Sequence, residues 1–508
     1  MPKLPLELVA LVIHHLAPTT HFPDKEDLKP LKTCSLVSKT WAILCRPHLF
    51  RTVELGFSIH FGKTVLHRLA KMLTDTPTLA KYIRTVRFTT IPIFVWNKPY
   101  VSMEYSDCQD DSELQERLDL EDSLGHTLLN LPNVRELEMH LSVNSAYEDV
   151  DIDVFGHRMF LEHYVANGQL TTIIIQGYVK QLPIMPFLSS PRLERLEITE
   201  CTFELTTEVW DTVECLGDAI YCSTPAALPD PMKTFSIKEL TLISCDNFPL
   251  GLTGRCKELE ALTLEDVTEG PMPAPGLHGP QDPILFNRLH TVDSCTTYIF
   301  PLVQSSRALS TKSIFPIMKS LSFHYDSYER PINPYTANFL LEQSQVLEFL
   351  FIENTFQDYD FSELNLSEAI RRSHDSLKHL SIKWCIESTD DAFLCSLCDA
   401  LECVRSQNFL ESLTVILIIK RRDPDEFDES DESMNTSPKC LACLSRLDVI
   451  LTREKQLGFP FLERVKFSIK FLCSAPLPDP NIVDNGLKNL SESPYIHLEC
   501  TIGPDIRV

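Results

Sequence analysis

The sequence predicts an α/β protein in which a short all-helical segment is followed by a long, irregular solenoid of strands and helices. Three observations favour this fold class: an apolar pattern recurs along the chain, each copy ends with the alternation of a half-buried strand, and helical stretches lie between copies. The predicted domains are residues 1–52 for the helices and 53–508 for the solenoid, with acidic loops at 105–123 and 421–438. Since 44% of the 508 residues are hydrophobic, the chain can bury a large core.

The chain opens with the segment MPKLPLELVALVIHHL, which predicts a helix that begins at Pro5, because proline suits the first helical position. Polar side chains between Leu4 and Leu16 are few: Glu7, His14 and His15. They share a stripe of about a third of the helix circumference or less, so apolar side chains cover most of the surface. They also interrupt the apolar core that a secretory signal needs, and no run reaches the roughly 20 apolar residues of a membrane span. We therefore expect a soluble protein of the cytoplasm or nucleus.

A polar insertion at 18–30 separates this helix from a second helical stretch, CSLVSKTWAILCRPHLF, which starts at Cys34. About 50 residues in short helices bury too little surface to be stable alone. One apolar face of the first helix can pack on Trp41 and its neighbours, and the opposite face then needs another cover. Either a partner protein or the chain's own solenoid, whose ends need caps, can supply that cover.

The solenoid is predicted from a repeat in which a leucine is followed by two variable residues, an aliphatic residue, one variable residue and another apolar residue. From Leu259 to Leu377 successive copies lie 30, 29, 29 and 30 residues apart. Each copy alternates apolar and polar positions, as a strand with one buried face does. The clear copies begin at Val134, Leu170, Leu193, Ile237, Leu259, Leu289, Met318, Leu347, Leu377, Leu410 and Leu462, and weaker copies begin at Phe50, Ile83, Leu444 and Tyr495.

Helical stretches are predicted between copies at 334–344, 366–376 and 389–406. The last of them opens with Thr389, Asp390 and Asp391, which suit the cap and first turn of a helix. One strand and one helix in each repeat make a solenoid. An unrelated α/β fold with many similar strands is the alternative.

The charge and the motifs of the chain exclude several classes of function. The 71 acidic and 46 basic residues give a net charge of -25, which opposes binding to nucleic acid or to anionic membrane, and the sequence shows no local basic patch. The sequence contains no G-x-S-x-G, no phosphate-binding glycine loop and no H-E-x-x-H. We expect neither an enzyme nor a bound cofactor, and we assign no catalytic residues.

The 17 cysteines follow no disulfide framework, and we expect reduced thiols that mostly fill the core. Two C-x-x-C pairs, Cys395 with Cys398 and Cys440 with Cys443, have the spacing of zinc ligands. Both pairs occupy apolar positions of helical stretches, and the distance between the pairs is longer than in common zinc modules. Small core residues are therefore the better account, and no metal site is predicted.

The repeat resembles that of the leucine-rich repeat family over roughly residues 50 to 508. The resemblance implies a curved horseshoe with parallel strands on its concave side and helices on its convex side. Intervals of 36 and 44 residues in the first half, the scarcity of the usual asparagine and Pro-rich loops such as 269–283 all imply an irregular horseshoe.

The N-terminal segment, over about residues 3 to 52, resembles the F-box, a helical motif that docks on the Skp-type adaptor of cullin-RING ubiquitin ligases. The polar insertion at 18–30 is longer than the usual gap in this family. The residues to which the resemblance assigns adaptor contact are Leu4, Pro5, Leu8, Ile13, Leu16, Cys34, Leu36, Val37, Trp41 and Leu49.

The two resemblances imply a substrate-recognition subunit of an SCF-type ubiquitin ligase, in which the solenoid holds a target protein. The alternative is a non-catalytic interaction scaffold whose N-terminal helices cap the solenoid and do not join a ligase. In the horseshoe, polar positions between the buried ones point to the concave side. The candidate target-binding residues there are Glu138, His140, Glu197, His324, Phe349, Phe351, Glu353 and Lys383.

Overall fold

The computed structural model describes most of the chain. The described residues are 5–18, 26–57, 69, 71–90, 129, 131–140, 150–151, 157–182, 184–203, 234–270, 286–295, 315–325, 334–344, 346–354, 364–387, 392–405, 408–420, 443–453, 458–472 and 480–504. The predicted acidic loops at 105–123 and 421–438, the insertion at 19–25 and Leu4 lie outside them.

The N-terminal segment forms three helices, which are α1 (Leu6–Leu16), α2 (Lys29–Ser35) and α3 (Lys39–Leu49). Pro5 is the N-cap of α1, so the helix begins at Leu6, one residue later than predicted. The N-cap of α3 is Ser38, whose hydroxyl accepts a hydrogen bond of 3.3 Å from the backbone N–H of Trp41. This bond satisfies one of the four N–H groups that the start of a helix leaves without a partner, which explains why the helix begins there.

Fifteen strands form one sheet, and neighbouring strands pair in parallel from β1 to β6 and from β8 to β15. Along the sheet the strands follow the order of the chain, except that β4 pairs beside β5 and lies off this path. The strands are β1 (Thr52–Phe57), β2 (Thr85–Thr90), β3 (Glu136–His140), β4 (Val150–Asp151), β5 (Thr172–Leu182), β6 (Arg195–Phe203), β7 (Glu239–Phe248), β8 (Ala261–Glu269), β9 (Thr291–Cys295), β10 (Ser320–Tyr325), β11 (Phe349–Asn354), β12 (His379–Glu387), β13 (Ser412–Lys420), β14 (Arg464–Leu472) and β15 (His497–Pro504).

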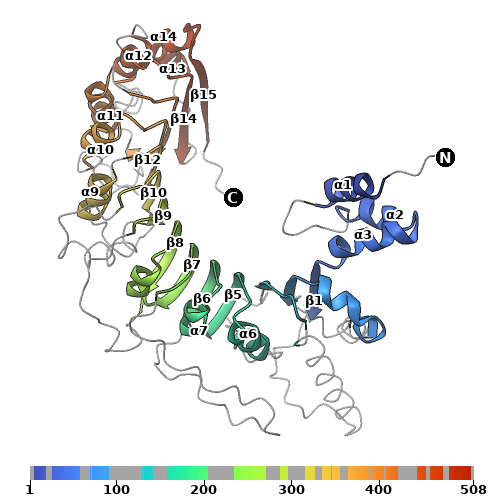
Figure 1. The fold of residues 1–508 in the computed structure, drawn as a ribbon. Helices are drawn as coiled ribbons and strands as arrows, with labels where there is room; N and C mark the ends of the chain where they lie inside the picture. The colour runs from blue at the N-terminus through green and yellow to red at the C-terminus, as the bar shows by residue number, and fades with distance from the viewer. Residues whose placement is uncertain are drawn as a thin grey trace, which may run out of the picture. The chain divides into compact units, whose positions relative to one another are not determined.

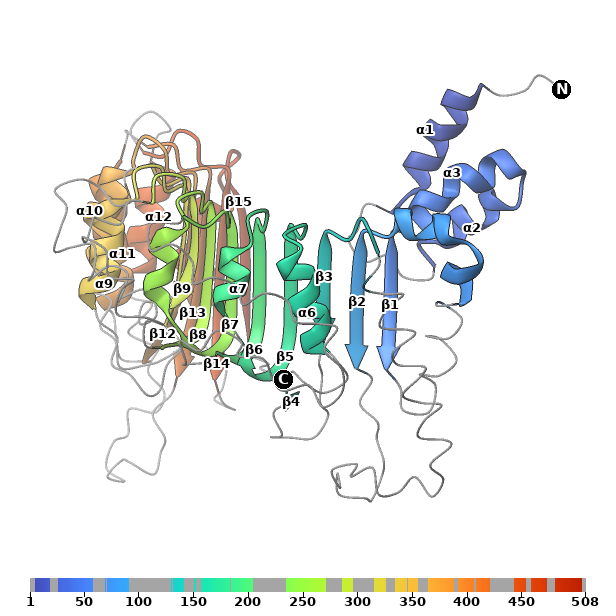
Figure 2. The ribbon, with the colours of Figure 1, turned by 60° about the horizontal axis from the view of Figure 1, so that its bottom comes forward.

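The connections between strands carry further helices. Those in the described residues are α6 (His157–Ala166), α7 (Ile184–Ser189), α9 (Pro334–Gln343), α10 (Leu366–Arg372), α11 (Ala392–Cys403), α12 (Leu444–Thr452), α13 (Pro480–Gly486), α14 (Lys488–Ser491) and the 3₁₀ helices η1 (Pro77–Tyr82) and η4 (Leu250–Arg255). Figure 2 shows α9 to α12 along one face of the strands beside them. Buried side chains such as Leu350 and Ile352 of β11 alternate with less buried ones, and the buried set forms the core.

The predicted class, an α/β fold with a long parallel sheet, is confirmed. Every clear copy of the repeat leads into a strand, and the predicted helices at 334–344, 366–376 and 389–406 coincide with α9, α10 and α11. One weak copy is wrong, because the segment from Leu444 belongs to α12. Its buried residues Leu444, Leu447 and Leu451 recur at three and four positions, which is the period of a helix.

The chain divides into two compact units. Figure 1 labels the helices and strands that each unit contains. Unit 1 comprises Met1–Asp230 with Phe235–Ile237 and Ser244–Phe248, and it contains α1 to α3 and the strands from β1 to β6. Unit 2 comprises Pro231–Thr234, Lys238–Ile243 and Pro249–Val508. The helical segment predicted as residues 1–52 is therefore grouped in one unit with the first strands of the solenoid.

One pair of cysteines differs from the expected reduced state. Cys395 of α11 and Cys443 at the N-cap of α12 form a disulfide, with their Cα atoms 5.9 Å apart. The sequence could not indicate this pair, because each cysteine belongs to a different C-x-x-C spacing. Cys398 is a free, buried thiol, as expected for a core residue, and Cys440 lies outside the described residues.

No helix among the described residues combines the length and the apolar character needed to cross a membrane.

Candidate functional site

The three N-terminal helices bury one face of α1 and leave another open. Four residues form the buried centre of this segment, namely Val9, Ile13, Leu31 and Cys45. Partly buried side chains pack around it: Leu16, Ala17, Leu28, Cys34, Trp41, Leu44 and Leu49. On α1 the inward stripe of Val9, Ile13 and Leu16 has helical spacing.

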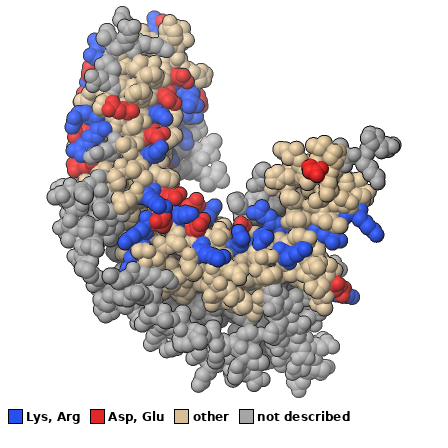
Figure 3. Space-filling model, in the orientation of Figure 1, with Lys and Arg blue, Asp and Glu red and all other residues tan. Residues whose placement is uncertain are grey.

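The opposite side of α1 is apolar and exposed. Leu8 is 47% exposed, Leu11 52% and Val12 41%, and their spacing of three and four positions places them on one stripe. The large hydrophobic side chains exposed in this segment are Leu6, Leu8, Leu11, Val12, Leu36, Val37 and Ile43. Figure 3 shows this part of the surface as mainly uncharged. Exposed apolar side chains in such numbers are typical of surfaces that contact another protein.

The residues predicted to contact an adaptor therefore fall into three groups. Pro5, Leu8, Leu36 and Val37 are exposed. The partly buried ones support the fold from the rim of the core, namely Leu16, Cys34, Trp41 and Leu49. Ile13, only 1% exposed, belongs to the core and cannot offer its side chain to a partner. We name the exposed set Leu6, Leu8, Leu11, Val12, Leu36, Val37 and Ile43 the apolar surface.

The contact residues predicted from the sequence do not include Leu6, Leu11, Val12 and Ile43. The helical period could have found Leu11 and Val12, because they lie three and four residues after Leu8. For Ile43, only the packing of α3 against α2 decides which apolar side chains are left outside.

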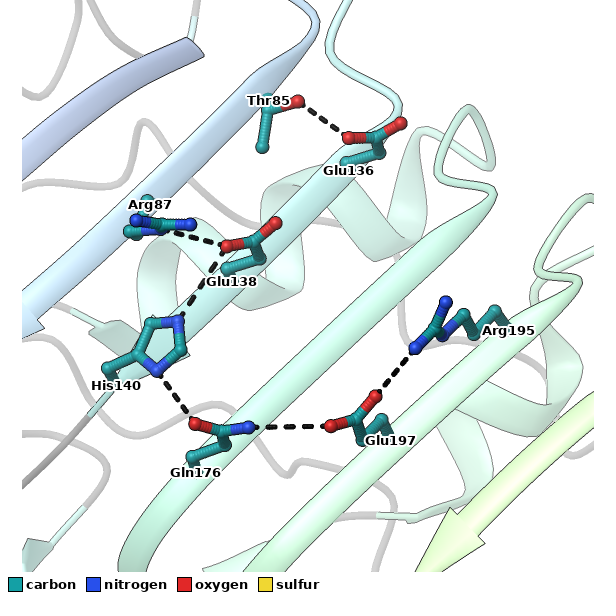
Figure 4. Close-up of polar contacts among 8 residues, drawn as sticks. All are labelled: Thr85, Arg87, Glu136, Glu138, His140, Gln176, Arg195 and Glu197. Carbon is teal, nitrogen blue, oxygen red and sulfur yellow. Dashed lines mark hydrogen bonds and ion pairs between the residues drawn. The ribbon is translucent and has the colours of Figure 1, made fainter. Parts of the chain in front are cut away.

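In unit 1 the predicted target-binding residues belong to a polar network across the sheet (Figure 4). Arg87 Nε donates to Glu138 Oε2 at 2.9 Å, and His140 Nε2 lies 3.7 Å from the same oxygen. His140 Nδ1 and Gln176 Oε1 are 2.9 Å apart. Gln176 Nε2 donates to Glu197 Oε1 at 3.4 Å, so Glu138, His140 and Glu197 are linked through β2, β3, β5 and β6.

Burial limits what this network can offer a partner. The side chain of Glu138 is 2% exposed because Arg87 and His140 cover it. Arg195 donates to Glu197 at 2.9 Å and keeps 43% of its side chain exposed. The carboxylate of Glu138 is thus held beneath the surface, whereas the side chains of Glu197 and Arg195 remain partly accessible.

In unit 2 the predicted residues form a second network, on one face of β9 to β12. The register places His324 opposite Glu353, and Glu353 opposite Lys383. His324 Nε2 donates to Asp293 Oδ1 at 2.8 Å, and its Nδ1 lies 3.4 Å from Glu353 Oε2. Lys383 Nζ donates to Glu353. Asp293, which the sequence did not single out, completes an alternating ladder of opposite charges.

Two aromatic side chains lie beside this ladder. Phe349 is 46% exposed, and its ring stacks on that of His379 with centroids 4.4 Å apart. Phe351 packs near the ring of His324, with 5.4 Å between centroids. An exposed aromatic group among polar neighbours suits a protein-binding face.

The ladder shifts the pKa values of its members. The hydrogen bond to Asp293, followed by that to Glu353, raises the pKa of His324 from 6.5 to about 10. Burial alone would raise the pKa of Glu353, but hydrogen bonds from His324 and Lys383 outweigh it and lower this pKa from 4.5 to about 2. His324 is therefore a cation at neutral pH, paired with two carboxylates.

The raised pKa of His324 predicts a pH dependence of stability. Because the folded state holds this proton more tightly, its stabilising effect is complete below pH 6.5 and is lost as the pH rises towards 10. The difference in free energy of unfolding between wild type and His324→Gln, measured in urea at pH 6, 8 and 10, should shrink with rising pH. A difference that stays constant over this range would contradict the assignment, as would an NMR titration of His324 near pH 6.5.

Within the described residues, no group of three or more histidine, cysteine, aspartate or glutamate side chains could hold a metal ion. The geometry instead offers an apolar surface on three helices and two polar networks on a sheet, which are features of protein recognition. Comparison with known protein families finds no match, and no curated protein matches the chain.

Proposed function

We propose that this protein is the substrate-recognition subunit of an SCF-type cullin-RING ubiquitin ligase. Helices α1 to α3 would act as an F-box that docks on the Skp-type adaptor, and the sheet, as a leucine-rich repeat solenoid, would hold a target protein. The chain itself would make and break no bond. The recruited ligase would modify the target because binding raises the local concentration of the target's lysines.

The apolar surface is the observation that carries the proposal. Seven of the fourteen large hydrophobic side chains that are exposed in the described residues lie between Leu6 and Ile43. Covering them would stabilise a complex by about 5 to 10 kcal/mol before the costs of association. If these helices were only a cap for the solenoid, Leu8 and Leu11 would be expected to pack against the chain's own strands, and both are about half exposed.

The test is co-purification of the full chain with the Skp-type adaptor. Leu8→Asp combined with Leu11→Asp places two carboxylates in the contact and should weaken adaptor binding at least 100-fold. Both side chains lie outside the core, so the fold should persist. The matched control is Val449→Asp on α12, where the valine is 49% exposed, and this variant should bind adaptor as wild type does.

Failure of the wild-type chain to bind adaptor would reject the receptor function and favour the scaffold. Binding by wild type that Leu8→Asp with Leu11→Asp leaves unchanged would place the contact elsewhere. Circular dichroism of each variant confirms that the helices are intact.

A further inference from the structure

The residues that immediately precede the strands form a row along one edge of the sheet, here called the edge row. In unit 1 its first three members are Arg51, Arg84 and Arg135, which precede β1, β2 and β3. Backbone hydrogen bonds join them as neighbours, because Arg84 N donates to Arg51 O at 2.8 Å and Arg135 N to Arg84 O at 2.8 Å. Three arginines on successive strands thus lie side by side.

The same row in unit 2 shows what its side chains do when their charges alternate. Lys319, Glu348 and Lys378 precede β10, β11 and β12. Glu348 lies 2.9 Å from Lys319 Nζ and 3.3 Å from Lys378 Nζ, so each side chain reaches its neighbour. Hydrogen bonds from Lys319 and then Lys378 lower the pKa of Glu348. Side chains at this position are therefore close enough to neutralise one another.

The arginine row has no such alternation. Among the ion pairs of the described residues, one involves an arginine of this row: Arg51 Nη2 lies 3.7 Å from Glu136 Oε1. Arg84 donates to the carbonyl of Asn133 at 3.5 Å, which leaves its charge in place. The Arg51 side chain is 54% exposed, and Arg135 is exposed. Figure 3 shows basic side chains gathered over this part of unit 1.

Like charges on adjacent strands are destabilising, so the row favours an anionic partner. Strands about 4.8 Å apart place the outer two arginines about 10 Å from each other. About three residues of an extended polypeptide cover this length. Each guanidinium group can hold a carboxylate through two hydrogen bonds.

We propose that Arg51, Arg84 and Arg135 form a binding site for a short acidic segment of a partner polypeptide. A long polyanion such as nucleic acid fits less well. Three arginines would contact only a short part of it, and the net charge of -25 would repel the rest. The proposal rests on the proposed function in treating the partner as the target that the solenoid holds. It assigns a chemical class to that target, namely a protein with a run of aspartate or glutamate.

The experiment measures fluorescence anisotropy of a labelled peptide with six consecutive glutamates, titrated with the full chain. Arg84→Gln combined with Arg135→Gln should raise the dissociation constant at least tenfold, and higher salt should weaken wild-type binding. The matched control, Lys319→Gln with Lys378→Gln, removes the same charge from the alternating part of the row and should bind as wild type does. Arg84→Lys with Arg135→Lys keeps the charge but not the paired hydrogen bonds and should give an intermediate constant.

The unfolding temperature of Arg84→Gln with Arg135→Gln should equal or exceed that of wild type, because like charges are removed. No peptide binding by wild type, or equal binding by this variant, would overturn the proposal. So would tighter binding of a single-stranded DNA of equal charge. Adaptor binding, measured on the same preparations, depends on the apolar surface, so either function can fail without the other.

Discussion

Ile13→Asp is expected to unfold α1 to α3 and thereby to abolish the proposed adaptor binding. Ile13 is 1% exposed in a core that has four buried members among the described residues, and an introduced carboxylate would have no partner there. Burying such a group costs several kcal/mol, about 3 or more, which a segment this small cannot absorb. Hydrogen exchange should show loss of amide protection throughout the three helices.

Leu11→Asp is the matched comparison on the same helix. Its side chain is 52% exposed, so the amides of α1 should keep their protection while adaptor binding is lost. Protection retained in Ile13→Asp would mean that the core does not depend on this residue. Equal loss of protection in Leu11→Asp would show that the apolar surface serves folding instead of binding.

Trp384→Ala is expected to lower the free energy of unfolding of unit 2 by about 3 to 5 kcal/mol. Trp384 of β12 is 1% exposed, and its ring stacks on Phe393 of α11 with centroids 6.0 Å apart. Removing it leaves a cavity between the sheet and a helix that covers it. Urea unfolding followed by circular dichroism measures the change.

Phe349→Ala on neighbouring β11 provides the control, because nearly half of this side chain is already in water. Phe349→Ala should lower the free energy of unfolding by less than about 1.5 kcal/mol, mainly through the lost stacking on His379. A similar loss for both variants would contradict the burial that separates them.

The repeat predicted the strands well because a half-buried strand imposes its alternation on every copy. The copy at Leu444 failed because Leu444 and Leu447, three positions apart, fit both the repeat and a helix, and only packing decides between them. The disulfide between Cys395 and Cys443 depends on the approach of two helices, which no local spacing encodes.

The candidate sites were predictable to a smaller extent. An unusually apolar first helix indicated a contact surface, yet the sequence could not distinguish exposed Leu11 from buried Ile13 without the packing of α2 and α3. Arg51, Arg84 and Arg135 are far apart in the chain, and the sequence shows no basic patch. They meet because the strands that follow them pair in register.

The in-order parallel pairing also has a consequence for how this chain can change over time. Thr85 pairs with Glu136 although the chain between Thr90 and Glu136 is long, whereas β10 and β11 are joined by a much shorter connection. Because each strand is aligned by hydrogen bonds to the strands directly beside it, the segments between strands can lengthen or shorten while the alignment of the strands is kept. Such a scaffold can acquire new recognition surfaces by insertion without redesign of what lies beneath them.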